Sequence, residues 1–412
     1  MQFKQVIGQK ETKSQLIQMV QQNRLSHALL FLGKEGTGGL SMARAFVQYI
    51  VCEKVNGKSS NNIENESPSL FGEEPVNNTA SVEIADMTDS CGICPACVKS
   101  SKLIHPDIHF SYPVVTKKPG EKPISTDYIV EWREFLKEQP YGNSFDWLQF
   151  IKAENKQGNI TANECNDIIR KMSLKSFESE YKFLIIWMPE LLGNEGNKLL
   201  KLIEEPPPNT VFILVAENED LIIPTILSRT QLIKLGPLRS IDIEAALELS
   251  EGISVEKATS IAAISEGNYH EALQQLKHAE DDWEILLRDW LNSIIKSGPA
   301  AQVKWVEEIS KIGREKQKQF LKYFNYLLEH AIRLKAIGDV STMEENDKQA
   351  SMNDFAHRFN KMCDVGQQEA IIKELDLATY YIERNANAKI LFHALTIKIY
   401  HIISNKSVIL MQ

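Results

Sequence analysis

The chain has 412 residues, of which 43% are hydrophobic and 25% charged. This composition excludes a largely disordered chain, and the chain is long enough for more than one folded domain. Its 46 basic and 55 acidic residues give a net charge of −9, which excludes a protein that coats nucleic acid with its whole surface. All apolar runs are strand-sized and Met1 is followed by no apolar signal segment, so we expect a cytoplasmic protein without a membrane span.

The N-terminal part predicts a strand, a glycine-rich loop and a helix in succession. Apolar spacing indicates an amphipathic helix over 11–23, a buried strand over 28–32 and a second helix over 40–52. This order is typical of a phosphate-binding loop, in which backbone amides at a helix N-terminus hold an anion. The glycines of this predicted nucleotide-binding loop are Gly33, Gly36, Gly38 and Gly39.

The loop lacks two side chains that ATP hydrolysis requires. In the pattern GxxxxGK[ST], Gly39 stands at the lysine position and Leu40 at the position of the hydroxyl that holds Mg²⁺. Lys34 is misplaced for the lysine's role, and Ser41 comes one residue too late for the metal. We therefore predict a degenerate phosphate loop, and the alternative is a strand–helix turn that binds no ligand.

Cysteines are clustered in a way that indicates metal binding. Cys91, Cys94 and Cys97 follow one another at CxxC spacing, which in a cytosolic protein is typical of a metal site and not of disulfides. Tetrahedral zinc takes four ligands, and Cys52, at the end of the predicted second helix, is the best candidate for the fourth. The alternative is a redox-active CxxC pair beside unrelated cysteines.

Two stretches of the N-terminal half are predicted to be inserts. The polar residues 54–90 indicate a mobile insertion, whereas the aromatic-rich residues 124–158 indicate a small packed one. A helix is expected over 161–174, with Thr161 as its N-cap and Glu164 completing a capping box.

Apolar runs predict the remaining strands, and the longest lacks a catalytic acid. An active phosphate-loop ATPase carries an acid that binds Mg²⁺ at the end of a central strand. Here Trp187 and Met188 stand at that point, and Glu190 lies beyond a proline. The strand ranges are an extended segment at 107–115 and buried strands at 181–187, 211–216 and 231–235.

Residues beyond 236 have only helical periodicity. We therefore predict an α/β domain at 1–236 that includes the cysteine module at about 52–97, a small helical group at 237–280, and a larger helical domain at 281–412. The fold class is α/β plus all-α, with a phosphate-loop type of parallel sheet.

Several motifs resemble those of bacterial DNA polymerase III clamp-loader subunits, which are AAA+ proteins, and most closely the delta-prime type. The resemblance covers most of residues 1–236. Its most specific motif is Asn197-Lys198-Leu199-Leu200-Lys201-Leu202-Ile203-Glu204-Glu205-Pro206-Pro207. The others are Val6-Ile7-Gly8-Gln9, His27-Ala28-Leu29-Leu30-Phe31, His105-Pro106-Asp107 and Pro224-Thr225-Ile226-Leu227-Ser228-Arg229.

This resemblance implies a role in loading a sliding clamp onto primed DNA. It implies an AAA+ core, a helical lid and a helical collar that joins five subunits, including gamma/tau and delta types, in a hetero-oligomeric ring. In such a ring ATP and Mg²⁺ are bound at subunit interfaces. The resemblance implies that Arg229 acts as an arginine finger at a neighbour's ATP site, and the alternative is a structural arginine that pairs with a carboxylate.

The resemblance also implies that this chain has no working ATP site of its own. Active relatives have a phosphate-sensing arginine in the lid, and His270 stands at that place here. With the lysine and the metal-binding acid also missing, the expected function is that of a structural subunit. Two alternatives remain, a gamma/tau-type ATPase with an unusual phosphate loop and a zinc-ribbon protein that binds nucleic acid on a degenerate ATPase scaffold.

Overall fold

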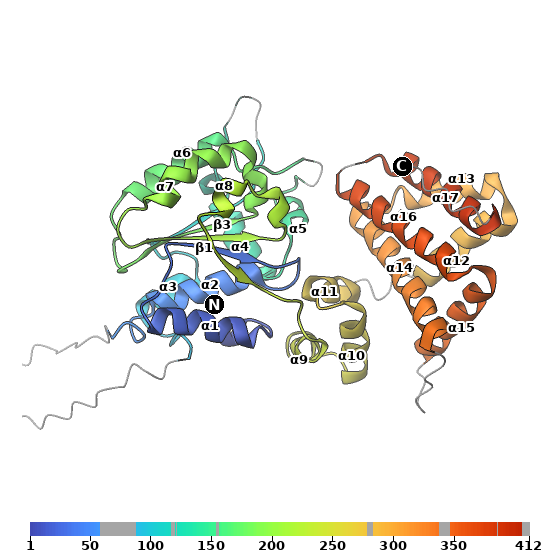
Figure 1. Ribbon diagram of the computed structural model, residues 1–412, viewed down its shortest axis with the longest axis horizontal. Coiled ribbons are helices and arrows are strands. Elements are labelled where there is room, and N and C mark those ends of the chain that lie inside the picture. Colours follow the sequence, from blue (N-terminus) through green and yellow to red (C-terminus); the bar gives the residue numbers. More distant parts are fainter. Residues whose placement is uncertain are drawn as a thin grey trace, which may run out of the picture. The chain divides into compact units, whose positions relative to one another are not determined.

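The computed structural model describes residues 1–57, 88–116, 120, 122–153, 156–277, 283–337, 347–384 and 386–405. They form two compact units, Met1–Lys277 and His278–Gln412 (Figure 1). Most of the predicted insertion at 54–90 lies outside the described residues. Among the residues described, no helix is long and apolar enough to cross a membrane.

The first unit is built on a five-stranded parallel sheet with the strand order β2-β3-β4-β1-β5. Every residue of β3 and β4 is buried, as expected for parallel strands covered on both faces. The sequence predicted all five strands to within a few residues. Their bounds are β1 Ala28–Leu32, β2 Ile108–Ser111, β3 Lys182–Trp187, β4 Thr210–Ala216 and β5 Gln231–Lys234.

Helices cover both faces of this sheet (Figure 1). Alternate strand residues face two separate apolar cores, one shared with α1 and α2 and the other with α6, α7 and α8. The parallel α/β part of the fold-class prediction is therefore confirmed. The helix bounds of this layer are η1 Phe3–Gln5, α1 Lys10–Gln21, α2 Gly39–Val51, α3 Pro95–Ser101, α6 Ala162–Ser173, η4 Pro189–Leu199, α7 Leu200–Glu204, η5 Glu219–Leu221 and α8 Pro224–Leu227.

The aromatic stretch at 124–158 packs into the α1–α2 side of the sheet. It contains η3 Ser125–Tyr128, α4 Ile129–Glu138 and α5 Ser144–Phe150. Trp132 and Trp147 are fully buried, with ring centroids 5.1 Å apart in an edge-to-face arrangement. The Trp147 indole donates a hydrogen bond to the Pro113 carbonyl at 2.7 Å. This segment is anchored by buried aromatic area, as the sequence suggested.

The capping box predicted at 161–164 is confirmed for Thr161 and wrong for Glu164. Thr161 does cap α6 by accepting a hydrogen bond from the Glu164 backbone. The Glu164 carboxylate, however, turns away and accepts hydrogen bonds from the Ser125 amide and hydroxyl, both at 2.6 Å. Because this buried carboxylate finds two donors in the aromatic segment, it does not reach back to the N-cap.

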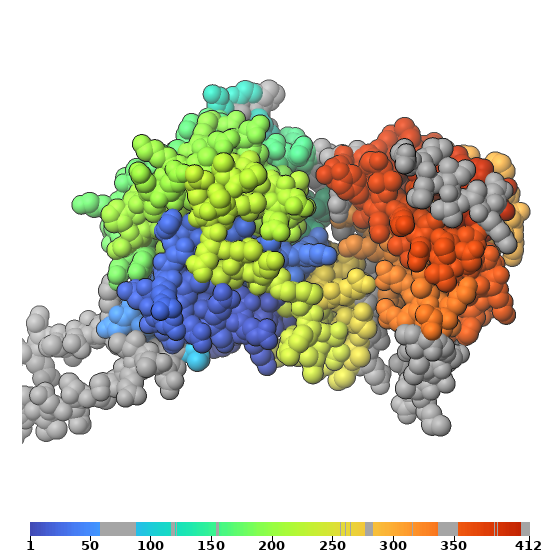
Figure 2. All heavy atoms as spheres, in the orientation of Figure 1, coloured from blue at the N-terminus to red at the C-terminus, as the bar shows by residue number. Residues whose placement is uncertain are grey.

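Three short helices complete the first unit, namely α9 Ser240–Glu251, α10 Val255–Ile264 and α11 Tyr269–Lys277. Their apolar core includes Tyr141 from the aromatic segment. The N-terminal segment also contacts the residues between β5 and α9. The side-chain amide of Gln9 donates a hydrogen bond to the Gly236 carbonyl at 2.6 Å. Figure 2 shows blue N-terminal residues beside these yellow-green residues on one face. The separate lid at 237–280 remains a prediction, since these helices belong to the same compact unit as the sheet.

The second unit is helical throughout its described residues. Trp290 and Trp305 stack in its core with centroids 4.6 Å apart, so they are core residues as expected. A role of this unit as a collar remains a prediction. Its elements are α12 Trp283–Asn292, η6 Ser293–Ser297, α13 Pro299–Ile309, α14 Arg314–Ile337, α15 Asp347–Met362, α16 Val365–Glu383 and α17 Ala388–Asn405.

Candidate functional site

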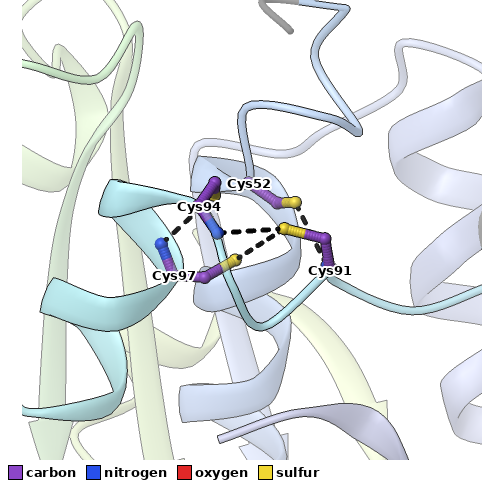
Figure 3. A group of neighbouring side chains, drawn as sticks. All are labelled: Cys52, Cys91, Cys94 and Cys97. Atoms are coloured by element: carbon purple, nitrogen blue, oxygen red, sulfur yellow. Dashed lines mark hydrogen bonds between the residues drawn. The ribbon is translucent and has the colours of Figure 1, made fainter.

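Four cysteines from two distant segments meet at the end of α2 (Figure 3). Cys52 is the C-cap of that helix, and the other three are Cys91, Cys94 and Cys97 around the start of α3. All four Sγ atoms lie within 4.8 Å of one another. Backbone amides already point at these sulfurs, since the Cys91 amide donates to Cys52 Sγ at 3.3 Å and the Cys94 amide to Cys91 Sγ at 3.4 Å.

This donor set fits a tetrahedral metal ion. Sulfurs at about 2.3 Å from one zinc ion lie about 3.8 Å apart in a tetrahedron, and Cys91 Sγ and Cys97 Sγ are separated by 3.9 Å. A hydrogen bond between the thiols lowers the pKa of Cys52 to about 4 and raises the pKa of Cys97. The spacing of the sulfurs allows the cluster to bind a metal ion, which would take all four groups as thiolates.

The two remaining cysteines lie outside this cluster. Cys165 and Cys363 are buried, and burial raises the pKa of each thiol to about 11. They are the inert buried thiols that the sequence indicated.

The predicted phosphate loop is the turn between β1 and α2. Thr37 closes it by donating from both its amide and its hydroxyl to the Lys34 carbonyl. Gly36 and Gly38 have φ values of 74° and 88°, a conformation that favours glycine. The loop lies at the carboxyl ends of the strands, where open parallel sheets bind ligands.

Other parts of the chain press against both of these glycines. A Cβ atom on Gly36 would lie 1.8 Å from Asn268 Oδ1, and one on Gly38 would lie 2.8 Å from Tyr141 Cε1. Ser41, the hydroxyl one residue beyond the metal-binding position of the pattern, is buried and donates to the Pro140 carbonyl at 2.7 Å. The loop is therefore covered by residues from the α4–α5 turn and from the start of α11.

The carboxylate nearest the end of β3 is held by the backbone. Met188 follows the strand in a left-handed conformation with φ 59°. Glu190 then accepts hydrogen bonds from the amides of Glu217 and Asn218 at 2.6 and 2.9 Å. Burial raises the pKa of Glu190, and the two amides fix its carboxylate at the end of β4. Its geometry is that of a structural cap.

His270, at the start of α11, is buried between two carboxylates. Its Nε2 lies 2.7 Å from Asp146 Oδ2. Its Nδ1 lies 2.6 Å from Glu35 Oε1, an ion contact without hydrogen-bond geometry. Burial alone would lower the pKa of His270, but the adjacent carboxylates of Asp146 and Glu35 outweigh burial and raise this pKa to about 10. The imidazole is therefore a cation at neutral pH.

Arg229 lies on the surface after α8, with 34% of its side chain exposed. Its guanidinium forms an ion pair with Glu204 at the end of α7 and donates to the Thr225 carbonyl at 2.8 Å. The two most specific sequence motifs thus meet at this pair. The carboxylate partner expected of a structural arginine is present, while the partial exposure leaves the guanidinium accessible to a second molecule.

Sequence reasoning missed the partners that hold these residues. Tyr141 and Asp146 carried no signal, because each acts on a residue far away in the chain. Glu204 lies in the most specific sequence motif, but its pairing with Arg229 was not predicted. The role of Asp107 was also missed. Its carboxylate accepts three backbone hydrogen bonds, from Phe177, Glu178 and Ser179 at 2.6–2.8 Å. The Asp107 residue of the His105-Pro106-Asp107 motif therefore fixes the loop before β3.

Comparisons with known proteins identify relatives of this chain. A family described as "DNA polymerase III, delta subunit" matches residues 8–70 and 143–239. The chain is 26% identical over 266 residues to DNA polymerase III subunit delta' of Bacillus subtilis, and 24% identical over 283 residues to subunit tau of that organism. It is 23% identical over 233 residues to subunit gamma/tau of Mycobacterium tuberculosis.

These matches cover only part of each protein. They span 64%, 67% and 55% of this chain, and 58%, 37% and 27% of the three relatives. The matched stretch is thus less than two thirds of each relative's length. What it covers includes the phosphate loop, the Asn197–Pro207 motif and Arg229.

Proposed function

We propose that the chain, which is similar to clamp-loader subunits of DNA polymerase III, is a delta-prime-like subunit. In this proposal it does not hydrolyse ATP itself, and it completes the ATP site of a neighbouring subunit with Arg229. The assembly would be a hetero-oligomeric ring of five subunits in the cytoplasm that places a sliding clamp on primed DNA. Its ATP and Mg²⁺ would be bound at the neighbour's site.

The observation that carries this proposal is the contrast between the chain's own loop and Arg229. Gly39 and Leu40 provide neither the cation nor the hydroxyl that an ATP site needs. His270, at the place of the sensing arginine, is buried against Asp146 and Glu35. Arg229, in contrast, keeps a partly exposed guanidinium, which is the group that stabilises charge on a transferring phosphoryl group.

We further propose a structural zinc ion in the cluster of Cys52, Cys91, Cys94 and Cys97. Four cysteines leave no open coordination position, which is typical of a structural and not a catalytic zinc site. The ion would tie the end of α2 to the start of α3 and so stabilise the first unit. Zinc-ribbon DNA binding is less well supported, since Lys99, one of two basic residues beside the cluster, is paired with Glu178.

The test of the arginine-finger proposal is ATP hydrolysis by the reconstituted loader. We expect Arg229→Ala to lower the clamp- and DNA-stimulated ATPase rate by about 10³-fold at the affected site, with assembly unchanged. Arg170→Ala is the matched control, because Arg170 is also an exposed arginine paired with a carboxylate on this unit. An unchanged rate in Arg229→Ala would overturn the proposal.

The isolated chain separates this proposal from the gamma/tau-type alternative. A delta-prime-like subunit hydrolyses no ATP on its own, whereas a gamma/tau-type ATPase does. The similarity to subunit tau at 24% identity makes this comparison necessary. Hydrolysis that is abolished by substitutions in residues 33–41 would favour the alternative.

A further inference from the structure

The turn between α4 and α5 lies directly against the phosphate loop. The Tyr141 ring contacts the Cα side of Gly38 so closely that even a Cβ atom there would be 2.8 Å from Tyr141 Cε1. The Tyr141 hydroxyl accepts a hydrogen bond from the Ile7 amide at 2.8 Å, which fixes the ring in this place. The neighbouring Pro140 carbonyl accepts from Ser41 at 2.7 Å. Two consecutive residues of the turn thus contact both sides of the N-terminus of α2.

The start of α5 extends this contact to the first half of the loop. The Asn143 side-chain amide donates to Glu35 Oε1 at 3.2 Å. Asn143 is itself the N-cap of α5, and its backbone amide donates a hydrogen bond to Asp146 Oδ2 at 3.0 Å. This capping box fixes both residues, so that Asn143 contacts the loop at Glu35 and Asp146 contacts His270.

Helix α11 closes the arrangement from the other side. The Tyr269 amide donates to the Gly36 carbonyl at 3.2 Å, and Asn268 fills the space beside Gly36. His270 then contacts Glu35 and Asp146 together. One imidazole therefore joins the phosphate loop, the α4–α5 segment and the helical group.

Without a ligand, this point carries a net negative charge, because two carboxylates face one imidazole. The charged groups that face His270 are Glu35 on the loop and Asp146 on α5, while its neighbour on α11 is the neutral Gln274. A phosphate loop must attract polyanionic nucleotide. Here the cation is already taken by two carboxylates, and both carboxylates oppose an incoming phosphate.

We propose that residues 140–146 act as a built-in plug of the chain's own phosphate loop, fastened to the helical group by His270. The plug gives the aromatic insert a function, which is to hold the loop and α11 in one fixed arrangement with no nucleotide between them. This inference goes beyond the proposed function and does not depend on Arg229, because it rests only on contacts within the first unit.

Hydrogen exchange of the full, zinc-loaded chain tests the fastening. We expect His270→Gln to raise amide exchange by about tenfold or more in three segments together, residues 34–41, 139–147 and 268–277, because a buried ion network loses its central partner. Asp146→Asn should do the same. It supplies a second variant if His270→Gln fails to fold. Asp354→Asn, which breaks an exposed ion pair with Arg358 in the second unit, is the control.

Two results would overturn the plug. One is a rise confined to α11 in His270→Gln, or confined to α5 in Asp146→Asn, since each would reduce the contact to local helix stability. The other is calorimetric binding of Mg–ATP or ADP to the wild-type chain with exchange at 139–147 unchanged. Binding to wild type leaves the Arg229 test unaffected, so failure of the plug and failure of the arginine finger are distinguishable.

Discussion

The cysteine cluster and the phosphate loop are both places where distant segments of the first unit converge, yet they differ in charge. At the cysteine cluster, all four converging groups are sulfurs that can bind a cation. At the loop, His270 meets Glu35 and Asp146. Convergence therefore favours a bound cation at the cysteines, where every converging group can bind one. It disfavours a bound anion at the loop, where two carboxylates face a single imidazole.

The largest expected effect comes from emptying the cysteine cluster. Metal removal, or Cys97→Ser, should destabilise the first unit by about 3 kcal/mol or more, because zinc binding free energy contributes directly to folding. The measurement is zinc content together with thermal unfolding in the presence and absence of a chelator. DNA affinity should stay unchanged.

Cys165→Ser is the control for this experiment, since it alters a buried thiol of the same unit that lies outside the cluster. It should leave the metal content of the chain intact. Equal melting curves with and without chelator would contradict a structural metal ion at the cysteine cluster.

A smaller effect is expected at the loop, from His270→Gln. At neutral pH this change should lower the free energy of unfolding by about 3 kcal/mol, because it leaves two carboxylates without their cation. Urea unfolding of the full chain measures this loss in the transition of the first unit.

The loss should depend on pH in a defined direction. The folded pKa of His270, about 10, is above its ordinary value of 6.5, so the ion network stabilises fully below pH 6.5. Its contribution is then lost progressively as pH rises toward 10. The wild-type and His270→Gln chains should therefore converge in stability as pH rises. A difference that stays constant from pH 6.5 to 10 would contradict a protonated His270.

The smallest effect on stability is expected at Arg229. Its pair with Glu204 is about one third exposed, and exposed ion pairs contribute about 0–1 kcal/mol. Arg229→Ala should thus unfold within about 1 kcal/mol of wild type, although it is expected to abolish stimulation of a neighbour's ATPase. A large loss of stability would instead indicate the purely structural arginine.

The sequence was most informative where one physical requirement acts locally. Apolar runs located strands such as Val211–Ala216 to within a residue, since a buried parallel strand must be apolar on both faces. Cys52 was found as the fourth sulfur because zinc requires four ligands, even though it lies far from Cys91 in the chain. In both cases a simple requirement, either apolar residues on both faces of a strand or four metal ligands, identifies the residues without knowledge of the tertiary structure.

Where the partner could be any of many residues, sequence reasoning failed. Glu164 was expected to complete a local capping box, but Ser125 offers it two donors that no local pattern reveals. The degenerate loop was predicted from its missing lysine, whereas its covering by Tyr141 was not. A contact between a ring and a glycine depends on the packing of α4 and α5, which only the folded chain defines.

The position of β1 in the sheet also bears on how the protein is made. This strand lies between β4 and β5, with Ala28 opposite Phe212 and Leu29 opposite Gln231. On the ribosome it therefore waits for partners that are translated about 180 residues later, or roughly ten to forty seconds at about 5–20 residues per second. During that interval the apolar strand has neither of its neighbours, so it is exposed to aggregation until β4 and β5 have been translated.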